Sequence, residues 1–331
     1  MAEAPDIWRT ITREAKEHRM PMNRRSFLAM TGAASLAASC APAAPTVAPP
    51  AAAPAASGAR KDQYAKPEML AETAWLADHL KDADIRIIDM RTAEKYNASH
   101  LPGAVRYDTA KLKDAAEKLY VVKPETFAKD MTDLGVGPTT KVIAYDDNGG
   151  LGPARLWWVL DYYGHTNAQI LNGGWNKWAK ESRPTSNEPT TVSGAGFKAT
   201  INPGVICALD VVEKASADTS YVIVDARSEG EYNGTDVRAA RGGHVPNAVN
   251  IDWQKNVTND DVRAWKSAAE LNQMYEAAGV TRDKNVITYC QTAVRAAHTL
   301  FTLRLLGYKQ VQNYDGSWAE WGNNPNTQIK K

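Results

Sequence analysis

The chain has 331 residues, of which 44% are apolar and 23% charged, a globular composition with room for two domains. Lys and Arg (39) nearly balance Asp and Glu (38), and the net charge of +1 gives no general attraction to nucleic acid or to an anionic membrane. The three cysteines form no CxxC pair, and with six scattered histidines they supply neither a disulfide framework nor a metal-ligand cluster. We therefore expect no nucleic-acid partner, no metal and no cofactor.

Residues 1–40 are predicted to be an export signal. Arg24 and Arg25 precede Ser-Phe-Leu and an uncharged run of small residues from Ala29 to Ser39, the n-region and h-region of such a signal. The run is shorter than the roughly 20 apolar residues of a membrane span. The paired arginines resemble the twin-arginine signal that bacteria use to export folded proteins. A short core helix behind two arginines is the alternative interpretation.

Cys40 follows Leu-Ala-Ala-Ser, which resembles a lipoprotein processing box with its leucine one position early. Lipidation of Cys40 and ordinary cleavage among the following alanines both stay open. Residues 41–65 are rich in Ala and Pro and are predicted to form a disordered tether. They contain too few large apolar groups to offset the entropy lost on ordering the chain. We expect a periplasmic mature protein, either soluble or lipid-anchored to the membrane.

From about residue 66 the sequence repeats itself, with the same motifs in the same order. These are Asp89-Met-Arg91 and Asp225-Ala-Arg227, His100-Leu-Pro-Gly-Ala and His244-Val-Pro-Asn-Ala, Tyr145-Asp146 and Tyr289-Cys290, and Gly-Gly-Trp175 and Gly-Ser-Trp318. Motifs that recur in the same order at a nearly constant spacing indicate an internal duplication, so the pattern predicts a duplicated domain of about 125 residues. The halves are expected at 66–185 and 206–331, with 186–205 as the linker between them.

In chain order, continuous β-branched runs predict strands that are buried on both faces. They are Ile85–Ile88, Lys141–Tyr145 and Ala168–Leu171 in the first half, and Tyr221–Val224, Asn285–Tyr289 and Lys309–Gln312 in the second. Predicted helices lie at Ala71–Leu80, Arg155–Tyr163, Ala268–Ala278 and Arg295–Leu306. This alternation predicts an α/β fold in which each half is a mainly parallel sheet flanked by helices. Ligands of such sheets bind beyond the carboxyl ends of the strands, where Asp146 and Cys290 stand.

Cys290 opens the loop Cys-Gln-Thr-Ala-Val-Arg between a buried strand and a helix that begins near Arg295. Several backbone amides and the positive end of the helix converge on such a loop and stabilise an anion. Because a thiolate is such an anion, Cys290 is a candidate nucleophile. Cys207 lacks this context and is expected to be a small buried apolar residue.

Four features together resemble the two-domain rhodanese sulfurtransferases over roughly residues 66 to 325: the tandem repeat, Asp-Ala-Arg with Gly-His-Val-Pro-Asn-Ala, the Cys-x4-Arg loop, and the closing Asp-Gly-Ser-Trp-x-x-Trp. The resemblance implies two tandem rhodanese-like domains, with Cys290 forming a persulfide in a catalytic carboxyl-terminal half. It implies that the amino-terminal half, with Asp146 at the equivalent position, is inactive. It also implies that Arg227 reaches the site, although Arg91 at the same repeat position leaves a structural ion pair as the alternative.

The implied reaction moves the outer sulfur of a small anionic donor onto Cys290 and then onto cyanide or a thiol. Arg227 and Arg295 are expected to neutralise the donor, and the loop amides are expected to hold the persulfide as an oxyanion hole holds oxygen. The loop residues so predicted are Gln291, Thr292, Ala293, Val294 and Arg295.

Thiosulfate is the favoured donor, because Cys-Gln-Thr resembles the loop of bacterial thiosulfate enzymes. The alternative donor is 3-mercaptopyruvate, for which Thr292 would deliver a proton with Asp89 and His100 as a relay. Both relay residues recur in the second half, as Asp225 and His244. Because the same residues occur in both halves, a structural role is favoured over a catalytic one for Asp89 and His100.

Other classes of function remain as alternatives. The protein could be a carrier that hands its persulfide to a partner protein without turnover, or a redox sensor. A tyrosine phosphatase also uses a Cys-x4-Arg loop, but this sequence lacks the preceding histidine and one further loop residue that those enzymes use. We expect a monomer.

Overall fold

The structure is a computed structural model of the chain, and it describes residues 63–331. The predicted export signal, Cys40 and nearly all of the tether lie outside the described residues, so these expectations stay predictions.

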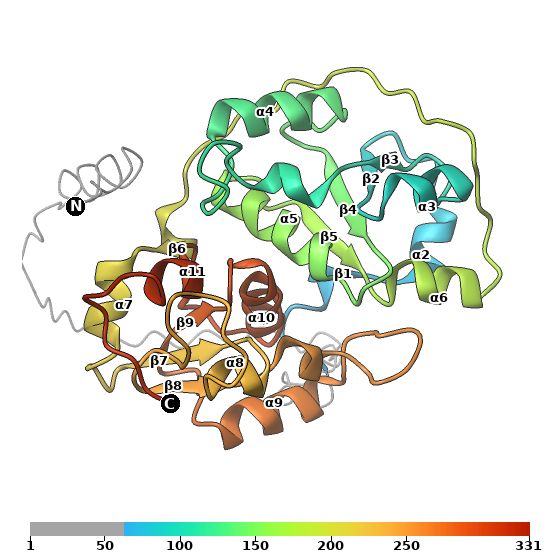
Figure 1. Cartoon of the computed structure of the whole chain (residues 1–331). Helices are drawn as coiled ribbons and strands as arrows, with labels where there is room; N and C mark the ends of the chain where they lie inside the picture. The colour runs from blue at the N-terminus through green and yellow to red at the C-terminus, as the bar shows by residue number, and fades with distance from the viewer. Residues whose placement is uncertain (1–62) are drawn as a thin grey trace, which may run out of the picture. The chain divides into compact units, whose positions relative to one another are not determined.

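Each half of the described chain is built on a five-stranded parallel sheet (Figure 1). The strand orders are β1-β5-β4-β2-β3 and β6-β10-β9-β7-β8, which are the same topology used twice. The predicted α/β fold with two parallel sheets is thereby confirmed. The strands are β1 (Leu70–Ala71), β2 (Ile85–Asp89), β3 (Val105–Arg106), β4 (Lys141–Tyr145), β5 (Ala168–Leu171), β6 (Ile206–Cys207), β7 (Tyr221–Asp225), β8 (Ala248–Asn250), β9 (Asn285–Tyr289) and β10 (Val311–Tyr314).

Helices cover the sheets, which explains why the central strands are buried along nearly their whole length. In the first half these are η1 (Pro67–Met69), α2 (Thr73–Asp78), α3 (Ala93–Ala98), η2 (Thr109–Leu112), α4 (Pro124–Asp133), α5 (Leu151–Tyr162) and α6 (Gly174–Lys180). In the second half they are η3 (Pro203–Val205), α7 (Leu209–Ala215), α8 (Glu229–Tyr232), η4 (Trp253–Asn256), α9 (Ala268–Ala277), α10 (Val294–Leu305) and α11 (Ser317–Trp321).

The two longest helices, α5 and α10, pack against each other and join the halves. Each follows a central strand, β4 or β9, so the loops that precede them occupy equivalent places in the two halves (Figure 1). Both helices are buried almost all round, because each has a sheet on one side and the other helix opposite. The positions of Asp146 and Cys290 at the carboxyl ends of these strands agree with the sequence prediction.

The strands missed by the sequence reasoning are β1, β3, β6 and β8, which have two or three residues each. So short a run has no periodicity to recognise, and its pairing depends on the neighbouring strand. Residues 188–202, within the predicted linker, form no helix or strand. They lie along the first half and are held there by two hydrogen bonds. Phe197 N donates to Thr132 Oγ1 (2.9 Å), and Thr200 N donates to Tyr163 O (3.0 Å). None of the helices between residues 63 and 331 is long and apolar enough to cross a membrane.

Candidate active site

Cys290 is the first residue after β9 and is 1% exposed. The chain turns into α10 three residues later, through Ala293, whose φ of 59° lies in the left-handed region. The cysteine packs in a small apolar cluster with Trp253 and Ala296, and Leu151 of the first half borders that cluster. The thiol is therefore sheltered at the junction of the two halves.

The backbone amides of the cysteine loop divide into two groups. The amides of Cys290 (3.2 Å) and Ala293 (3.1 Å) donate to Ser317 Oγ, which in turn donates to the carbonyl of Tyr314 (2.8 Å). In the described part of the chain, the amides of Thr292, Val294 and Arg295 have no recorded acceptor. Because such free amides at a helix start favour an anion, the loop has the donors that a thiolate or persulfide needs.

The equivalent loop of the first half directs its backbone amides onto a carboxyl side chain. The carboxylate of Asp146 accepts hydrogen bonds from Asn148 N (3.0 Å) and Gly150 N (2.8 Å) through Oδ1, and from Gly152 N (3.0 Å) through Oδ2. Burial raises the pKa of Asp146 above its usual value, although these three amides oppose the change. The turn from strand to helix thus directs amides onto one anionic side chain. A carboxylate there cannot carry a sulfane sulfur, which agrees with the prediction that this half is inactive.

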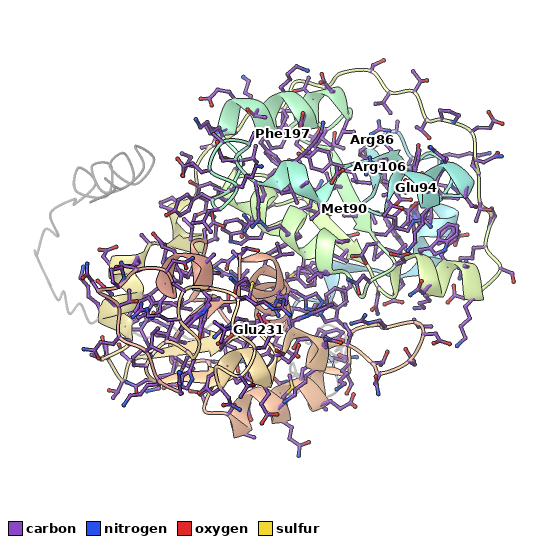
Figure 2. The ribbon with its side chains drawn as sticks, viewed as in Figure 1. Arg86, Met90, Glu94, Arg106, Phe197 and Glu231 are labelled. Atoms are coloured by element: carbon purple, nitrogen blue, oxygen red, sulfur yellow. The ribbon has the colours of Figure 1, made fainter. Side chains whose placement is uncertain are left out.

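Arg295, in the first turn of α10, binds Glu231 of α8 with two hydrogen bonds of 2.6 and 2.8 Å. Burial raises the pKa of Glu231, but the Arg295 guanidinium and Ser228 lower it to about 2. Burial lowers the pKa of Arg295, whereas Glu231 and the charge of the nearby Cys290 raise it. Figure 2 marks Glu231 in the carboxyl-terminal half. Arg295 therefore lies at the cysteine, as predicted, but with a carboxylate already bound.

Arg227 does not point its hydrogen-bond donors at the cysteine loop. Its Nε and Nη2 bind Asp225 at 2.6 to 3.1 Å, Nη2 also donates to Gly243 O (2.7 Å), and the guanidinium lies 4.4 Å from the ring centre of Trp318. In the amino-terminal half Arg91 makes the equivalent contacts with Asp89, Ser99 O and Trp175. The contacts of Arg227 are thus those of the structural ion pair, and its binding to the donor stays a prediction without support from them.

The proposed relay residues also have partners elsewhere. Asp89 accepts hydrogen bonds from Arg91 and Tyr145, and the ring nitrogens of His100 lie 2.8 Å from Tyr96 O and 3.1 Å from Glu188 O. These partners lie in the first half, except Glu188, which lies in the predicted linker. Among the described residues no hydrogen bond joins Asp89 or His100 to the cysteine loop, which favours the scaffold interpretation.

The remaining loop residues lie where the sequence predicts them. Gln291 donates from Nε2 to Arg238 O (2.9 Å), and the half-buried Thr292 and Val294 follow it into α10. The structure therefore brings residues 290–295 together as one site and leaves Asp89 and His100 outside it.

The sequence reasoning missed three contributors. Ser317 holds two loop amides, and Glu231 holds Arg295. From the first half, Arg155 donates through Nη1 to Asp315 Oδ1 (2.9 Å) and to the carbonyl of Ala293 (3.4 Å), with Arg155 and Asp315 fully buried. For Ser317 the repeat does offer a signal, because the two halves differ at this position. The equivalent residue of the first half is Gly174, and a Cβ there would lie 2.3 Å from Asp146 O. Nothing in the local sequence indicates the other two.

Comparison with known proteins gives the same architecture. The family model described as Rhodanese-like domain matches residues 72–181 and 208–324. The sulfur carrier protein TtuD of Thermus thermophilus is 36% identical over 78% of this chain and 95% of its own. A thiosulfate sulfurtransferase of Azotobacter vinelandii is 32% identical over 81% of this chain and 99% of its own.

A solved structure extends the comparison to three dimensions. The 3-mercaptopyruvate sulfurtransferase SseA of Escherichia coli superposes with a TM-score of 0.69 and 31% identity, over 76% of this chain and 98% of that one. Two domain matches and relatives above 30% identity along most of their length show that the chain belongs to the rhodanese family, with one rhodanese-like domain in each half.

Proposed function

We propose that this protein is a sulfurtransferase that moves a sulfane sulfur from thiosulfate, through a persulfide on Cys290, to cyanide or a thiol. The main observation behind the proposal is that Cys290 lies at the start of α10, where the described backbone amides of Thr292, Val294 and Arg295 have no hydrogen-bond acceptor. The internal comparison with Asp146 supports it, because the same turn directs three amides onto a negative charge. Relatives named thiosulfate sulfurtransferase support the choice of reaction.

The chemistry is two displacements at sulfur. The Cys290 thiolate attacks the outer sulfur of thiosulfate, a new sulfur–sulfur bond forms, and the old one breaks with its electron pair leaving on sulfite. The acceptor, cyanide or a thiolate, then attacks the outer sulfur of the persulfide and releases the Cys290 thiolate. Negative charge remains at the loop throughout, so the amides of Thr292, Val294 and Arg295 stabilise each state.

The choice between donors follows from proton delivery. Sulfite leaves without a proton, whereas departure of the enolate of mercaptopyruvate calls for one. The residues that could relay that proton to Thr292 are Asp89 and His100, and their hydrogen bonds are made within the first half. This supports thiosulfate as the donor. Mercaptopyruvate remains the second candidate, because an Escherichia coli relative is named for it.

The nucleophile is tested by replacing Cys290 with Ser, with Cys207→Ser as the matched control. Burial raises the pKa of Cys207 well above its usual range, so this thiol is not ionised near neutral pH. Sulfur transfer should vanish in the first variant and persist in the second. Equal losses in both variants would contradict the assignment. Steady turnover of free donor and acceptor would exclude a carrier that only loads once, which is the alternative that the Thermus relative suggests.

The donor is tested by measuring kcat/KM for thiosulfate and for mercaptopyruvate. Thr292→Val should hardly change transfer from thiosulfate, whereas Arg295→Gln should weaken it by about one to two powers of ten, since a charge-assisted hydrogen bond contributes roughly 1.5–3 kcal/mol. Faster turnover of mercaptopyruvate, abolished by Thr292→Val, would establish the second candidate instead.

We further propose that the mature protein is exported to the periplasm as a monomer. The support is the sequence of residues 1–40, with Arg24 and Arg25 ahead of an uncharged run and Cys40 at its end. Mass spectrometry of the native amino terminus tests the location: an acylated Cys40 means a lipid anchor, a free end within 41–59 means release, and an intact Met22 refutes export. Size-exclusion chromatography tests the monomer.

A further inference from the structure

A loop of the amino-terminal half reaches the catalytic half beside Cys290. Residues 113–121, here named the first crossing loop, are closed by an antiparallel bridge between Lys113 and Val121. The amide of Val121 donates to Asp315 Oδ2 (2.6 Å), and the hydroxyl of Tyr120 donates to Glu320 Oε1 (2.8 Å). Asp315 stands just beyond β10, two residues before the serine that holds the cysteine loop. The first crossing loop is thus fastened to the base of the catalytic site.

The repeat supplies a second crossing loop, residues 257–265, which shows what such a loop can reach. The amide of Trp265 donates to Asn172 Oδ1 (3.0 Å), the position equivalent to Asp315. From the same loop, Arg263 Nη1 donates to Asn148 Oδ1 (2.8 Å), and Asn148 belongs to the loop between β4 and α5. A cation on this crossing loop is therefore placed on the anion-holding loop of the opposite half.

The arginines around Cys290 already have carboxylate partners. The pairs are Arg295 with Glu231, Arg227 with Asp225, and Arg155 with Asp315, with shortest distances of 2.6, 2.6 and 2.9 Å. Each pair is close to neutral, so none of the three offers a full charge to an incoming anion. A dianionic donor would therefore be bound more tightly by an additional cation that belongs to no such pair.

Lys113 is that cation. Its side chain is half-buried, and within residues 63–331 no carboxylate lies at ion-pair distance from its ammonium group. The charged groups whose fields act on its ammonium are Arg155 of α5, Asp315 beyond β10 and Cys290 beyond β9. Burial and Arg155 lower the pKa of Lys113 to about 8, although Asp315 and Cys290 oppose the change.

We propose that Lys113, contributed by the amino-terminal half, binds the anionic end of the sulfur donor while its outer sulfur reacts at Cys290. An ammonium group offers three donors, and charge-assisted hydrogen bonds to sulfonate-type oxygens are short and strong. The inference rests on the proposed function and deepens it. The half without a nucleophile then takes part in recognition of the donor.

The first test compares Lys113→Met, Lys113→Arg and Lys118→Met in the full-length protein. Lys118 is exposed on the same loop and forms no ion pair among the described residues, which makes it the matched control. With thiosulfate at pH 7, Lys113→Met should raise KM about tenfold and leave kcat within about twofold, because it removes binding shared by ground state and transition state. Lys113→Arg should restore most of the affinity, and Lys118→Met should behave as the wild type.

The second test uses pH, since arginine keeps its charge where Lys113 loses it. The ratio of kcat/KM for Lys113→Arg to that for the wild type cancels the ionisation of Cys290. This ratio should rise by about tenfold between pH 7 and 9.5, centred near pH 8. A ratio that stays flat would overturn the inference.

The outcomes separate the inference from the proposed function. Wild-type protein that transfers no sulfur from thiosulfate would refute the proposed function, and the inference with it. Wild-type turnover with an unchanged KM in Lys113→Met, or an equal change in Lys118→Met, would overturn the inference alone. Circular dichroism of each variant shows whether the fold is kept, and rescue by Lys113→Arg identifies the charge as the cause.

Discussion

Replacing Glu231 with glutamine tests the ion pair that holds Arg295 beside the cysteine. The Glu231 side chain is 1% exposed, and its carboxylate accepts hydrogen bonds from Arg295 (2.6 and 2.8 Å) and Ser228 N (3.2 Å). These partners lower the pKa of Glu231 from 4.5 to about 2. At about 1.4 kcal/mol for each pKa unit, the interaction stabilises the folded protein by about 3 kcal/mol at pH 7.

The pH dependence has a definite sign. A carboxyl group whose pKa is lower in the folded protein stabilises the fold above its unfolded pKa, and loses that contribution as pH falls through its folded pKa. For Glu231 the window runs from about 4.5 down to about 2. The free energy of unfolding of Glu231→Gln should therefore lie about 3 kcal/mol below that of the wild type at pH 7, and only about 1.4 kcal/mol below it at pH 3.

The measurement is urea denaturation followed by tryptophan fluorescence at both pH values. Glu229→Gln is the control, because Glu229 is exposed on the same helix and forms no ion pair among the described residues. A difference between wild type and Glu231→Gln that is equally large at pH 3 and pH 7 would refute the reasoning. So would an effect of Glu229→Gln that matches it.

Two further substitutions probe the support of the site. Ser317→Ala removes the acceptor for the amides of Cys290 and Ala293. The kcat for sulfur transfer should therefore fall about tenfold, with a smaller change in KM. An unchanged kcat would show that the loop keeps its shape without the hydroxyl. Gly150→Ala adds a Cβ that would lie 2.4 Å from a tryptophan ring at a φ of 81°, and should cost about 2–4 kcal/mol in thermal or urea unfolding. Gly279→Ala, with a φ of 77° and nothing within 4 Å, should cost only about 1 kcal/mol, and equal losses would mean that packing at Gly150 is irrelevant.

The central strands and the nucleophile could be predicted because their signals are local. The runs Lys141–Tyr145 and Asn285–Tyr289 are strands with the predicted bounds, since a strand buried on both faces is a mostly apolar run that can be recognised in the sequence. Cys290 follows from the strand–loop–helix order alone. The predicted strand Lys309–Gln312 starts two residues before the observed strand, Val311–Tyr314, because Lys309 and Gln310 form a bend ahead of it.

The sequence by itself therefore determined the duplicated α/β fold and the place of Cys290 to Arg295 between a central strand and a helix. Only the tertiary structure decided which charges near the cysteine are free. Arg227 is held by Asp225 and Arg295 by Glu231, whereas Lys113, from the other half of the chain, has no ion-pair partner among residues 63–331. Spacing along the chain encodes which residues share a strand or a helix turn. It does not encode which carboxylate neutralises which guanidinium, because that depends on side chains brought together by the packing of the two halves.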